Sequence, residues 1–376
     1  MSNVNRRAFL ASAAVATAAA ARLSGAESDR LRVGFVGVGS RGTALLRNFL
    51  DAKLGDVVAV CDTKPEHAKR AATLVTGAGQ KEPALVEDWH KLLEAKDVRA
   101  VVAALPCDLH AACYLDTIAA GKDLYGEKPM CLTPADCDKV VKAAGASKQI
   151  VQIGFQRRAD PRFIEPMKLI HQGELGDLVE GRIMWSNSWG PLGDWFGQRA
   201  RSGDWMVEQA CHNWDVINWA CRGLPVRAMG LGRTGLFKSF QADRDVHDYY
   251  SAVVEYENGA IINILHSWVA PGQNGKFTKE FNDEYTRLNG VKAGIDFNSG
   301  VIAYRKELNV PDKVAHSATG AINNTKLGLE AFAASVASRK PPVATVEHGR
   351  DAVLACLLVR EAVYQRKPIT MKELRG

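Results

Sequence analysis

A glycine-rich turn directly after a short apolar segment constrains the fold of this chain more than any other feature. Residues 33–36 are apolar, and residues 37–42 follow them with the spacing Gly-x-Gly-x-x-Gly. In folds that bind dinucleotides, Gly37 allows the tight turn, Gly39 lets the backbone approach a pyrophosphate and Gly42 allows the helix to pack on the strand. The pattern therefore predicts a strand, a phosphate-binding turn and a helix.

The residues around this turn favour the same interpretation. Ser40 and Arg41 lie at the start of the expected helix, where free N–H groups and a partial positive charge suit a phosphate. Arg41 adds a further charge there, unless it is simply solvated. Asp62 stands 20 residues after Gly42, where a carboxylate accepts hydrogen bonds from ribose hydroxyls and repels a 2′-phosphate. Lys64 weakens this preference without reversing it, so we expect NAD rather than NADP. The alternative is the same fold without a nucleotide.

An N-terminal domain is predicted over residues 31–154 from short apolar segments that alternate with helical patterns. Strands are expected over 33–37, 57–61, 100–104, 123–125 and 150–154, and helices over 43–50, 66–74, 109–119 and 134–144. Right-handed crossovers place the carboxyl ends of such strands at one edge, where ligands bind. The expected fold class is α/β, with a doubly wound parallel sheet of the Rossmann type in this domain.

A second domain, over residues 155–376, is predicted to be α+β with a large, open, mainly antiparallel sheet. Two alternating segments, 249–256 and 260–266, flank a turn that contains Asn258 and Gly259, which is typical of a β-hairpin. Residues 349–365 are apolar at helical spacing and are expected to pack back on the body. The open sheet is a candidate surface for homo-oligomer formation.

The first residues predict export. Arg6 and Arg7 precede an alanine-rich apolar stretch, and small residues follow at 24–26, so residues 1–26 are interpreted as a twin-arginine signal peptide. The apolar stretch 8–21 is 14 residues long, short of the roughly 20 that a membrane-spanning helix needs, so no membrane anchor is expected. We expect passage through the twin-arginine translocase to the periplasm. Because that route carries folded proteins, a cofactor loaded in the cytoplasm would have to be retained.

Charge and cysteine usage exclude other classes. The formal net charge of +6 falls by 3 to +3 without the leader, which contains Arg6, Arg7 and Arg22, and no basic stripe suggests nucleic acid. The eight cysteines form no C-x-x-C pair, so buried free thiols are expected and no thiol-based metal motif is present.

A family resemblance rests on three motifs. Residues 126–129 are Gly-Glu-Lys-Pro, residues 104–106 are Ala-Leu-Pro with His110 close behind, and residues 205–215 carry acid-x-x-x-His-x-x-Asp. With the glycine turn, this combination resembles the Gfo/Idh/MocA oxidoreductase family over essentially the whole chain after the leader, from 31 to 369. The resemblance implies catalytic Lys128 and His212, with Glu208 as their partner. It also places Leu105, Pro106, His110, Glu127 and Lys128 at the cofactor. The family more often has Asp at the position of Glu208.

The chemistry explains these residue types. Oxidation of a carbinol needs a base within hydrogen-bond reach of the hydroxyl, and histidine has a suitable pKa. A partly desolvated Lys128 beside nicotinamide is expected to have a lowered pKa and, when charged, to stabilise a developing alkoxide. Glu208, His212 and Asp215 are spaced to share one face of a helix, where an acid can fix the imidazole tautomer. The alternatives are a surface lysine, a core histidine, or a metal held by the three helical residues; we expect no metal.

Substrate contacts are expected near a cluster of tryptophans. Six of the eight lie between residues 185 and 219, at positions 185, 189, 195, 205, 214 and 219, and flat aromatic faces suit sugar rings. Trp214 and Trp219 are expected in the core. The candidate substrate-binding residues are Gln156, Arg158, Trp195 and Asp215, although Asp215 is expected to be structural rather than catalytic. Arg157 and Asp194 also offer polar contacts.

Together these patterns predict an exported NAD-dependent oxidoreductase that acts on a hydroxyl of a carbohydrate or polyol with a tightly bound cofactor. The alternative is an NAD-dependent glycosidase or lyase that works by transient oxidation, elimination, hydration and re-reduction. A third possibility is a ligand-binding module that kept the fold without catalysis.

Overall fold

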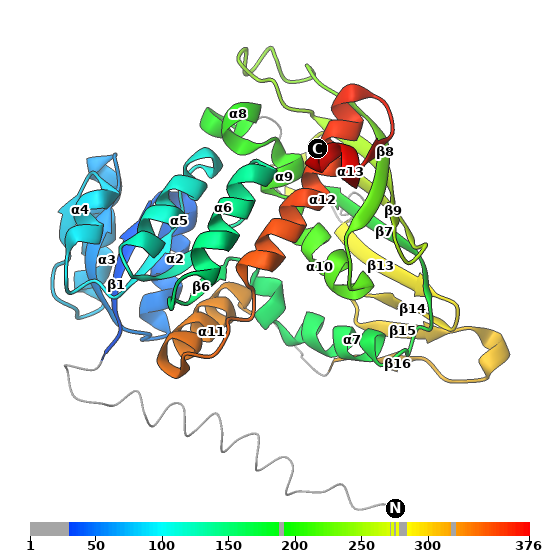
Figure 1. Cartoon of the computed structure of the whole chain (residues 1–376), viewed down its shortest axis with the longest axis horizontal. Helices are drawn as coiled ribbons and strands as arrows, with labels where there is room; N and C mark the ends of the chain where they lie inside the picture. The colour runs from blue at the N-terminus through cyan, green and yellow to red at the C-terminus, as the bar shows by residue number, and fades with distance from the viewer. Residues whose placement is uncertain (1–29, 188–191, 271, 274–275, 278–283, 317–320) are drawn as a thin grey trace, which may run out of the picture.

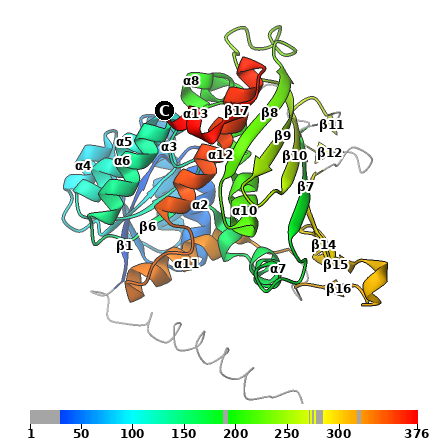
Figure 2. The same ribbon diagram turned by 45° about the vertical axis from the view of Figure 1, so that its right-hand side comes forward.

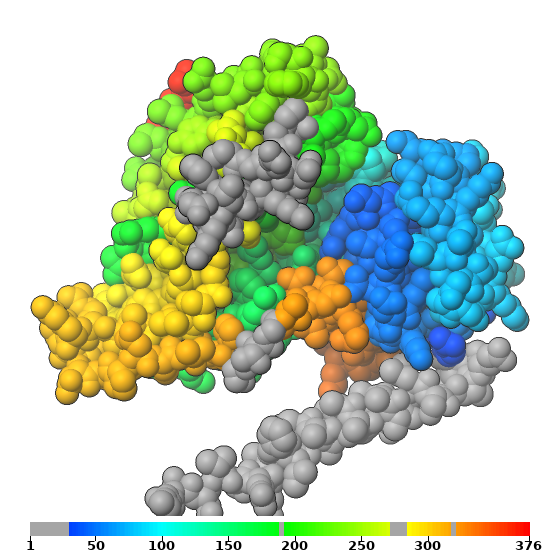
Figure 3. All heavy atoms as spheres, turned by 180° about the vertical axis from the view of Figure 1, so that it is seen from behind, coloured from blue at the N-terminus to red at the C-terminus, as the bar shows by residue number. Residues whose placement is uncertain are grey.

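The computed structural model describes residues 30–187, 192–270, 272–273, 276–277, 284–316 and 321–376. The predicted signal peptide, residues 1–26, and Trp189 lie outside these ranges. Figure 1 shows two domains side by side, with helix α12 (Val346–Gln365) running between them. From behind, the N-terminal domain in blue and the C-terminal domain in green and yellow again lie next to each other (Figure 3), with residues of α11 in orange between them.

The N-terminal domain is the doubly wound α/β unit that the sequence predicts. Its six strands are all parallel and follow the order β3-β2-β1-β4-β5-β6. The strands are β1 (Arg32–Val36), β2 (Asp56–Cys61), β3 (Ala84–Val86), β4 (Ala100–Ala103), β5 (Asp123–Gly126) and β6 (Val151–Ile153). The connecting helices are α2 (Ser40–Asp51), α3 (Pro65–Gly77), α4 (Trp89–Glu94), α5 (His110–Ala119) and α6 (Pro134–Gly145). Neither β3 nor α4 was predicted.

Alternation along β1 divides the core of this domain into two layers. Val33 and Phe35 pack with residues of α2 and α3 on one face, whereas Val36 packs with residues of α4, α5 and α6 on the other. This follows from the period of two along a strand, because successive side chains point to opposite faces. Both faces are covered by helices, and in open α/β sheets of this kind ligands bind outside the carboxyl ends of the strands.

The C-terminal domain is built on a nine-stranded sheet in the order β16-β15-β14-β13-β7-β10-β9-β8-β17. Its strands are β7 (Leu178–Ser186), β8 (Pro225–Arg233), β9 (Tyr249–Tyr256), β10 (Ile261–Ser267), β13 (Glu284–Gly290), β14 (Ala293–Asp296), β15 (Val301–Tyr304), β16 (Lys313–Val314) and β17 (Ile369–Thr370). Only the β7–β10 pair among these is parallel. The predicted hairpin is confirmed as β9 and β10, with Gly259 at φ +82° in the turn.

Helices cover one face of this sheet (Figure 2). They include α7 (Pro161–His171), α9 (Trp205–Glu208), α10 (Cys211–Cys221) and α12. The other helices in this part of the chain are α8 (Arg199–Ser202), α11 (Asn324–Ser338) and α13 (Met371–Arg375), and β11 (Gly272–Gln273) pairs with β12 (Lys276–Phe277) in a separate small sheet. The predicted C-terminal helix is confirmed as α12. Its Gly349 lies so close to Met130 that an added Cβ would approach the sulfur to 2.8 Å, which brings α12 against the loop that follows Lys128.

Helix α11 comes late in the chain but packs on the N-terminal sheet. Its Leu329 and Phe332 are fully buried in the same hydrophobic cluster as Phe35 and Tyr125. The N-terminal domain therefore includes a helix from beyond residue 154, because α11 completes its core.

All eight cysteines have free thiols, as expected, and seven of them are buried. No helix in the described ranges combines the length and the apolar character that crossing a membrane requires.

Candidate active site

The three glycines of the turn have different structural requirements. Gly37 has φ +77°, and a Cβ there would lie 2.3 Å from the carbonyl oxygen of Ala104. A Cβ on Gly42 would lie 1.9 Å from the carbonyl oxygen of Gly37. The fold itself therefore needs both glycines. At Gly39 the nearest atom to an added Cβ is 3.9 Å away, on His67. The fold leaves this space open, which fits the close approach of a dinucleotide.

The start of α2 offers free backbone donors beside this space. Gly39 is the N-cap residue and supplies no side-chain acceptor, and the first intrahelical bond from the turn is donated by the Thr43 N–H to the Gly39 carbonyl. The amides of Ser40, Arg41 and Gly42 thus lie in the first turn, where helix N–H groups lack intrahelical partners and suit a phosphate.

The side chain of Arg41 has a different partner from the phosphate that we expected. Its Nε and Nη2 lie 2.8 and 2.7 Å from Oε1 of Glu127, and its Nη1 donates to the Thr325 hydroxyl at 3.1 Å. Burial opposes its charge, but Glu127 together with Tyr125 and Glu208 outweighs this, so the pKa of Arg41 is raised. Arg41 and Glu127 therefore join the phosphate-binding helix to the loop that carries Lys128.

Asp62 lies at the end of β2, next to the glycine turn. Its Oδ2 accepts a hydrogen bond from the Val38 N–H at 2.8 Å, and its Oδ1 accepts one from the Lys64 N–H at 2.9 Å. Each carboxylate oxygen has capacity for another donor. The position and the free acceptor capacity of Asp62 fit a ribose diol. The glycine turn, the first N–H groups of α2 and Asp62 together fit NAD.

His110 holds two loops of the site together. Its Nδ1 lies 2.6 Å from the Pro129 carbonyl oxygen and its Nε2 lies 2.9 Å from the Leu105 carbonyl oxygen, and the side chain is 1% exposed. Burial lowers its pKa. Because both ring nitrogens face backbone carbonyls, the side chain positions the Leu105-Pro106 segment and the Lys128-Pro129 segment.

Lys128 and Glu208 form the central ion pair of the site. The Nζ atom of Lys128 lies 2.5 Å from Oε1 of Glu208 and also donates to the Glu208 carbonyl at 2.7 Å. Each side chain is 13% exposed. Burial is the largest influence and acts to lower the pKa of Lys128, but the charge of Glu208, nearby Cys211 and Glu127 and the hydrogen bond to Glu208 together outweigh it, so the pKa is raised. The expectation of a lowered lysine pKa is therefore wrong for this structure, and Lys128 is a cation at neutral pH.

The predicted continuous helix over 205–215 is also wrong. The chain forms α9, ending at Glu208, and a separate α10, beginning at Cys211. The His212 N–H donates to the Gln209 carbonyl at 3.3 Å, whereas the Glu208 carbonyl accepts from Lys128. The lysine takes the acceptor that a continuous helix would use, so Glu208 and His212 no longer share one helix.

His212 has the properties of a neutral base. Its side chain is 9% exposed, and its Nδ1 is buried without a hydrogen-bond partner in the described ranges. Burial, followed by the positive charges of Lys128 and Arg157, lowers its pKa well below its usual range. Glu208 bonds to Lys128 and not to this imidazole, so the expected role of the acid in fixing the tautomer is not seen.

Arg157, which the sequence offered only as a possible polar contact, lies beside His212. Its guanidinium lies over the rings of Phe163 and Trp185, at 5.3 and 5.6 Å from their centroids. Its Nη1 lies 3.4 Å from the His212 carbonyl oxygen. Burial lowers the pKa of Arg157.

The predicted substrate residues are not all gathered in one place. Arg158 and Asp215 form a buried bidentate pair at 2.9 and 3.0 Å, and burial raises the pKa of Asp215 to about 6. These two residues therefore serve each other as partners. Gln156 has a buried Oε1 without a partner in the described ranges and lies against α11. Trp195 is partly buried and packs on Phe196, with ring centroids 4.2 Å apart.

The other tryptophans divide between core and site. Trp205 and Trp214 are fully buried, and Trp219 lies under the guanidinium of Arg158 at 4.8 Å. Trp185 stacks on His266 at 5.4 Å. Within the described ranges, no group of three or more His, Cys, Asp or Glu side chains is arranged to hold a metal ion.

Comparisons with known proteins agree with this geometry. Residues 31–155 match a family described as an oxidoreductase family with an NAD-binding Rossmann fold, and residues 164–296 match the GFO/IDH/MocA C-terminal domain.

Two curated relatives are similar over part of the chain. An inositol 2-dehydrogenase of Acidothermus cellulolyticus is 29% identical over 63% of this chain and 66% of its own length. A glycosyl hydrolase family 109 protein of Shewanella pealeana is 27% identical over 41% of this chain and 34% of its own length. The chain thus spans less than two thirds of these relatives.

A solved structure extends the similarity in fold to nearly the whole chain. Levoglucosan dehydrogenase in complex with NADH and levoglucosan superposes with a TM-score of 0.77 at 18% identity, covering 91% of this chain and 99% of that one. At this identity the superposition shows a common fold.

Proposed function

Because this chain belongs to the GFO/IDH/MocA oxidoreductase family, we propose that it uses NAD to oxidise a hydroxyl group of a carbohydrate or polyol. The observation that carries the proposal is the arrangement of Lys128, Glu208 and His212 beside the carboxyl end of β5. A charged donor and a neutral base stand together at the edge of the sheet that also carries the glycine turn.

The two catalytic side chains take complementary roles. Bound nicotinamide would accept hydride from the carbinol carbon. Charged Lys128 donates a hydrogen bond to the hydroxyl oxygen and stabilises the negative charge that develops there. His212, which is neutral because its pKa is lowered, accepts the hydroxyl proton. Glu208 is a positioning residue that keeps Lys128 in place and charged.

The cofactor proposal extends to specificity and retention. Asp62 favours NAD over NADP because its carboxylate repels a 2′-phosphate. We propose that the protein leaves the cytoplasm by the twin-arginine pathway, as residues 1–26 predict, and keeps its dinucleotide in the periplasm. Reoxidation then takes place on the protein, with a second sugar or carbonyl compound as acceptor. Denaturing the purified mature protein should release about one dinucleotide per chain, whereas release of none would refute retention.

Similarity to the glycosyl hydrolase family 109 protein supports a second candidate function. In this alternative, oxidation of a sugar carbinol acidifies the adjacent C–H, a glycosidic group is eliminated, water adds and the carbonyl is reduced again. The same Lys128 and His212 would serve the oxidation and the re-reduction. Net NAD reduction is zero in this cycle, which separates it from the dehydrogenase reaction.

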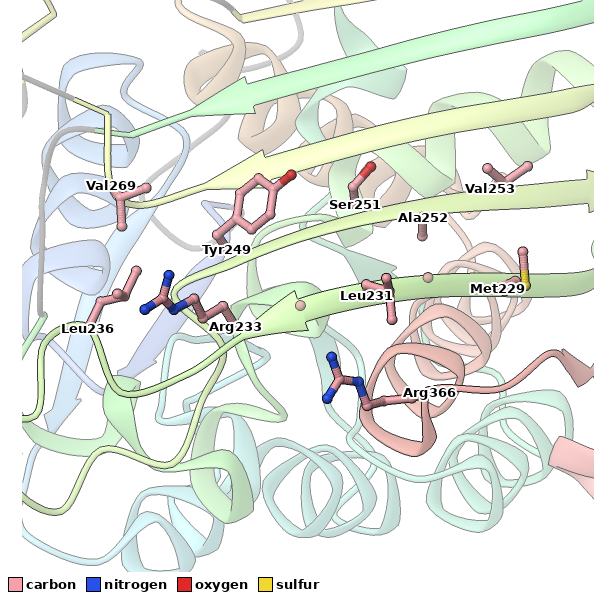
Figure 4. A pocket seen from close by; sticks show the side chains of 12 residues that line it. Met229, Leu231, Arg233, Leu236, Tyr249, Ser251, Ala252, Val253, Val269 and Arg366 are labelled. Atoms are coloured by element: carbon pink, nitrogen blue, oxygen red, sulfur yellow. The ribbon is translucent and has the colours of Figure 1, made fainter.

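The exposed face of the large sheet supports a homo-oligomer. Figure 4 shows apolar side chains standing on the outer side of β8 and β9. Met229 and Leu231 are 54% and 58% exposed, and Val253 beside them is 43% exposed. An apolar face of this kind favours burial against a second copy. Leu231→Asp should therefore shift the mass measured by light scattering to that of a monomer, whereas Leu85→Asp, at an exposed site on the N-terminal domain, should not.

The function is tested by supplying sugars one at a time to the purified protein with NAD. Absorbance at 340 nm and chromatography of the products are followed together for D-glucose, myo-inositol, levoglucosan and alkyl glycosides. A stoichiometric rise with a keto product supports the dehydrogenase. Release of free sugar from a glycoside without net NAD reduction would support the glycosidase instead, and no change with any compound would leave a binding module.

A further inference from the structure

A buried network of side chains ends at Gln209, which lies between Glu208 and His212 in the chain. The Oε1 atom of Gln209 accepts three hydrogen bonds, from Nε2 of His266 at 2.8 Å, from Nδ2 of Asn187 at 3.0 Å and from Nε1 of Trp268 at 3.2 Å. All four side chains are buried, Gln209 being 6% exposed. The carboxyl ends of β7 and β10 bring these donors together.

The orientation of this amide is fixed by chemistry. An indole N–H can only donate, so the atom facing Trp268 must be the oxygen. His266 then carries its proton on Nε2, and its Nδ1 accepts from the Tyr250 hydroxyl at 3.3 Å. Burial lowers the pKa of His266 well below its usual range, which agrees with a neutral ring. Turning the Gln209 amide over would set its NH2 group against two or three donors.

The amide nitrogen of Gln209 is therefore directed away from the network. Nitrogen and oxygen lie on opposite sides of a carboxamide, and within the described ranges Nε2 has no hydrogen-bond partner. The network is continuous with the catalytic groups, because Trp185 stacks on His266 and Arg157 lies over Trp185 and against the His212 carbonyl.

We propose that Gln209 is a specificity-determining residue whose Nε2 donates a hydrogen bond to a substrate oxygen next to the carbon that is oxidised. This inference rests on the proposed function. Since Nε2 can only donate, the substrate must present an acceptor there, such as a hydroxyl or a ring oxygen. The buried network of Asn187, His266 and Trp268 holds the donor in place before substrate arrives, so little side-chain freedom is lost on binding.

The test compares substrates that differ by one oxygen. The best substrate among D-glucose, myo-inositol and levoglucosan is assayed beside its monodeoxy derivatives with wild-type protein, Gln209→Met and Gln209→Glu. In the wild type, removal of one particular hydroxyl should lower kcat/KM by roughly tenfold, the range of one hydrogen bond. Gln209→Met should lose a similar factor on the parent sugar and show no further loss on that deoxy derivative.

One control and one second variant at position 209 keep the result specific. Gln172→Glu changes an exposed glutamine at the end of α7 and should keep the wild-type discrimination. Gln209→Glu keeps the shape and the oxygen that faces Trp268, but it replaces the free donor by an acceptor, so it should also abolish the discrimination. NAD binding and thermal unfolding report whether each variant is folded, and the Glu variant decides the question if the Met variant is not.

The outcomes separate this inference from the proposed function. Wild-type oxidation with the same discrimination in both Gln209 variants would overturn the role of Gln209 and leave the oxidoreductase intact. Failure of the wild type to oxidise any of the sugars would overturn the proposed function and this inference with it.

Discussion

Lys128 and Glu208 join the two domains through a partly buried contact of 2.5 Å between Nζ and Oε1. The same lysine also binds the Glu208 carbonyl and thereby interrupts the helix that precedes His212. One side chain thus links the two domains and sets the local backbone that precedes His212, the proposed base. The glutamate has one more methylene than the aspartate that we expected to be more common in the family, and it still reaches the lysine directly.

Replacing Lys128 should slow catalysis strongly and leave the cofactor in place. Lys128→Met removes the charged donor from the hydroxyl oxygen, so kcat should fall about 10²- to 10⁴-fold. The dinucleotide contacts of the glycine turn are untouched, so NAD bound per chain, measured after denaturation, should stay at the wild-type value. Loss of NAD together with activity would contradict this division of roles.

Replacing Glu208 should move the alkaline limb of the pH–rate profile. In the wild type Glu208 raises the pKa of Lys128 and keeps it charged into the alkaline range. Glu208→Gln removes the largest cause that raises this pKa, while burial still acts to lower it, so the pKa of Lys128 should fall and activity should be lost at lower pH than in the wild type. Glu208→Asp, which keeps the charge, is the matched control. If the alkaline limb of Glu208→Gln lay at the same pH as that of the wild type, the pKa of Lys128 would not depend on the Glu208 carboxylate.

Replacing Arg157 should move the acid limb of the pH–rate profile to higher pH. Its positive charge is one of the causes that lower the pKa of His212, after burial and Lys128. In Arg157→Met the pKa of His212 should rise, so the base becomes protonated at higher pH and activity falls earlier on acidification. The profile of kcat/KM against pH measures this directly. Arg162→Met is a suitable control because Arg162 pairs with Asp160 instead. A shift in the opposite direction would contradict the assignment of His212 as the base.

The glycine turn offers a matched pair of substitutions. Gly42→Ala would place its Cβ 1.9 Å from the Gly37 carbonyl oxygen, so the variant should be strongly destabilised in thermal unfolding. Gly39→Ala meets nothing closer than 3.9 Å and should unfold like the wild type. It should nevertheless bind NAD much more weakly in calorimetric titration, because the methyl group occupies the space for the pyrophosphate. Wild-type NAD affinity in Gly39→Ala would place the cofactor elsewhere.

The sequence predicted those parts of the fold that depend on local pattern. The apolar strands, the glycine turn and the Asn258-Gly259 hairpin are confirmed because periodicity and turn chemistry act over a few residues. Strand β3 and helix α4 were missed because they are three and six residues long, too short for a clear period. The break between α9 and α10 depends on Lys128, 80 residues earlier in the chain, and no local pattern carries that information.

The sequence indicates candidate site residues and names Glu208 as a partner of Lys128, but it does not indicate the more distant pairs that hold the site. Lys128, His212 and Glu208 were identified from motifs, whereas the Arg41–Glu127 and Arg158–Asp215 pairs join residues 86 and 57 positions apart. His266 carried no interpretable context in the sequence, because its role depends on Gln209 and Tyr250, which only the folded sheet brings together. Burial, which sets the direction of the His212 pKa shift, likewise depends on both domains.

The central claim is tested most directly by following deuterium. The purified protein with NAD is given uniformly carbon-deuterated D-glucose, myo-inositol or levoglucosan in ordinary water, and the dinucleotide is analysed by mass spectrometry. The account predicts that the reduced dinucleotide gains one deuterium from at least one of these compounds, and that Lys128→Met and His212→Ala do not form it. Reduced dinucleotide without deuterium, or none from any sugar or polyol, would contradict the claim that this site oxidises a carbohydrate hydroxyl.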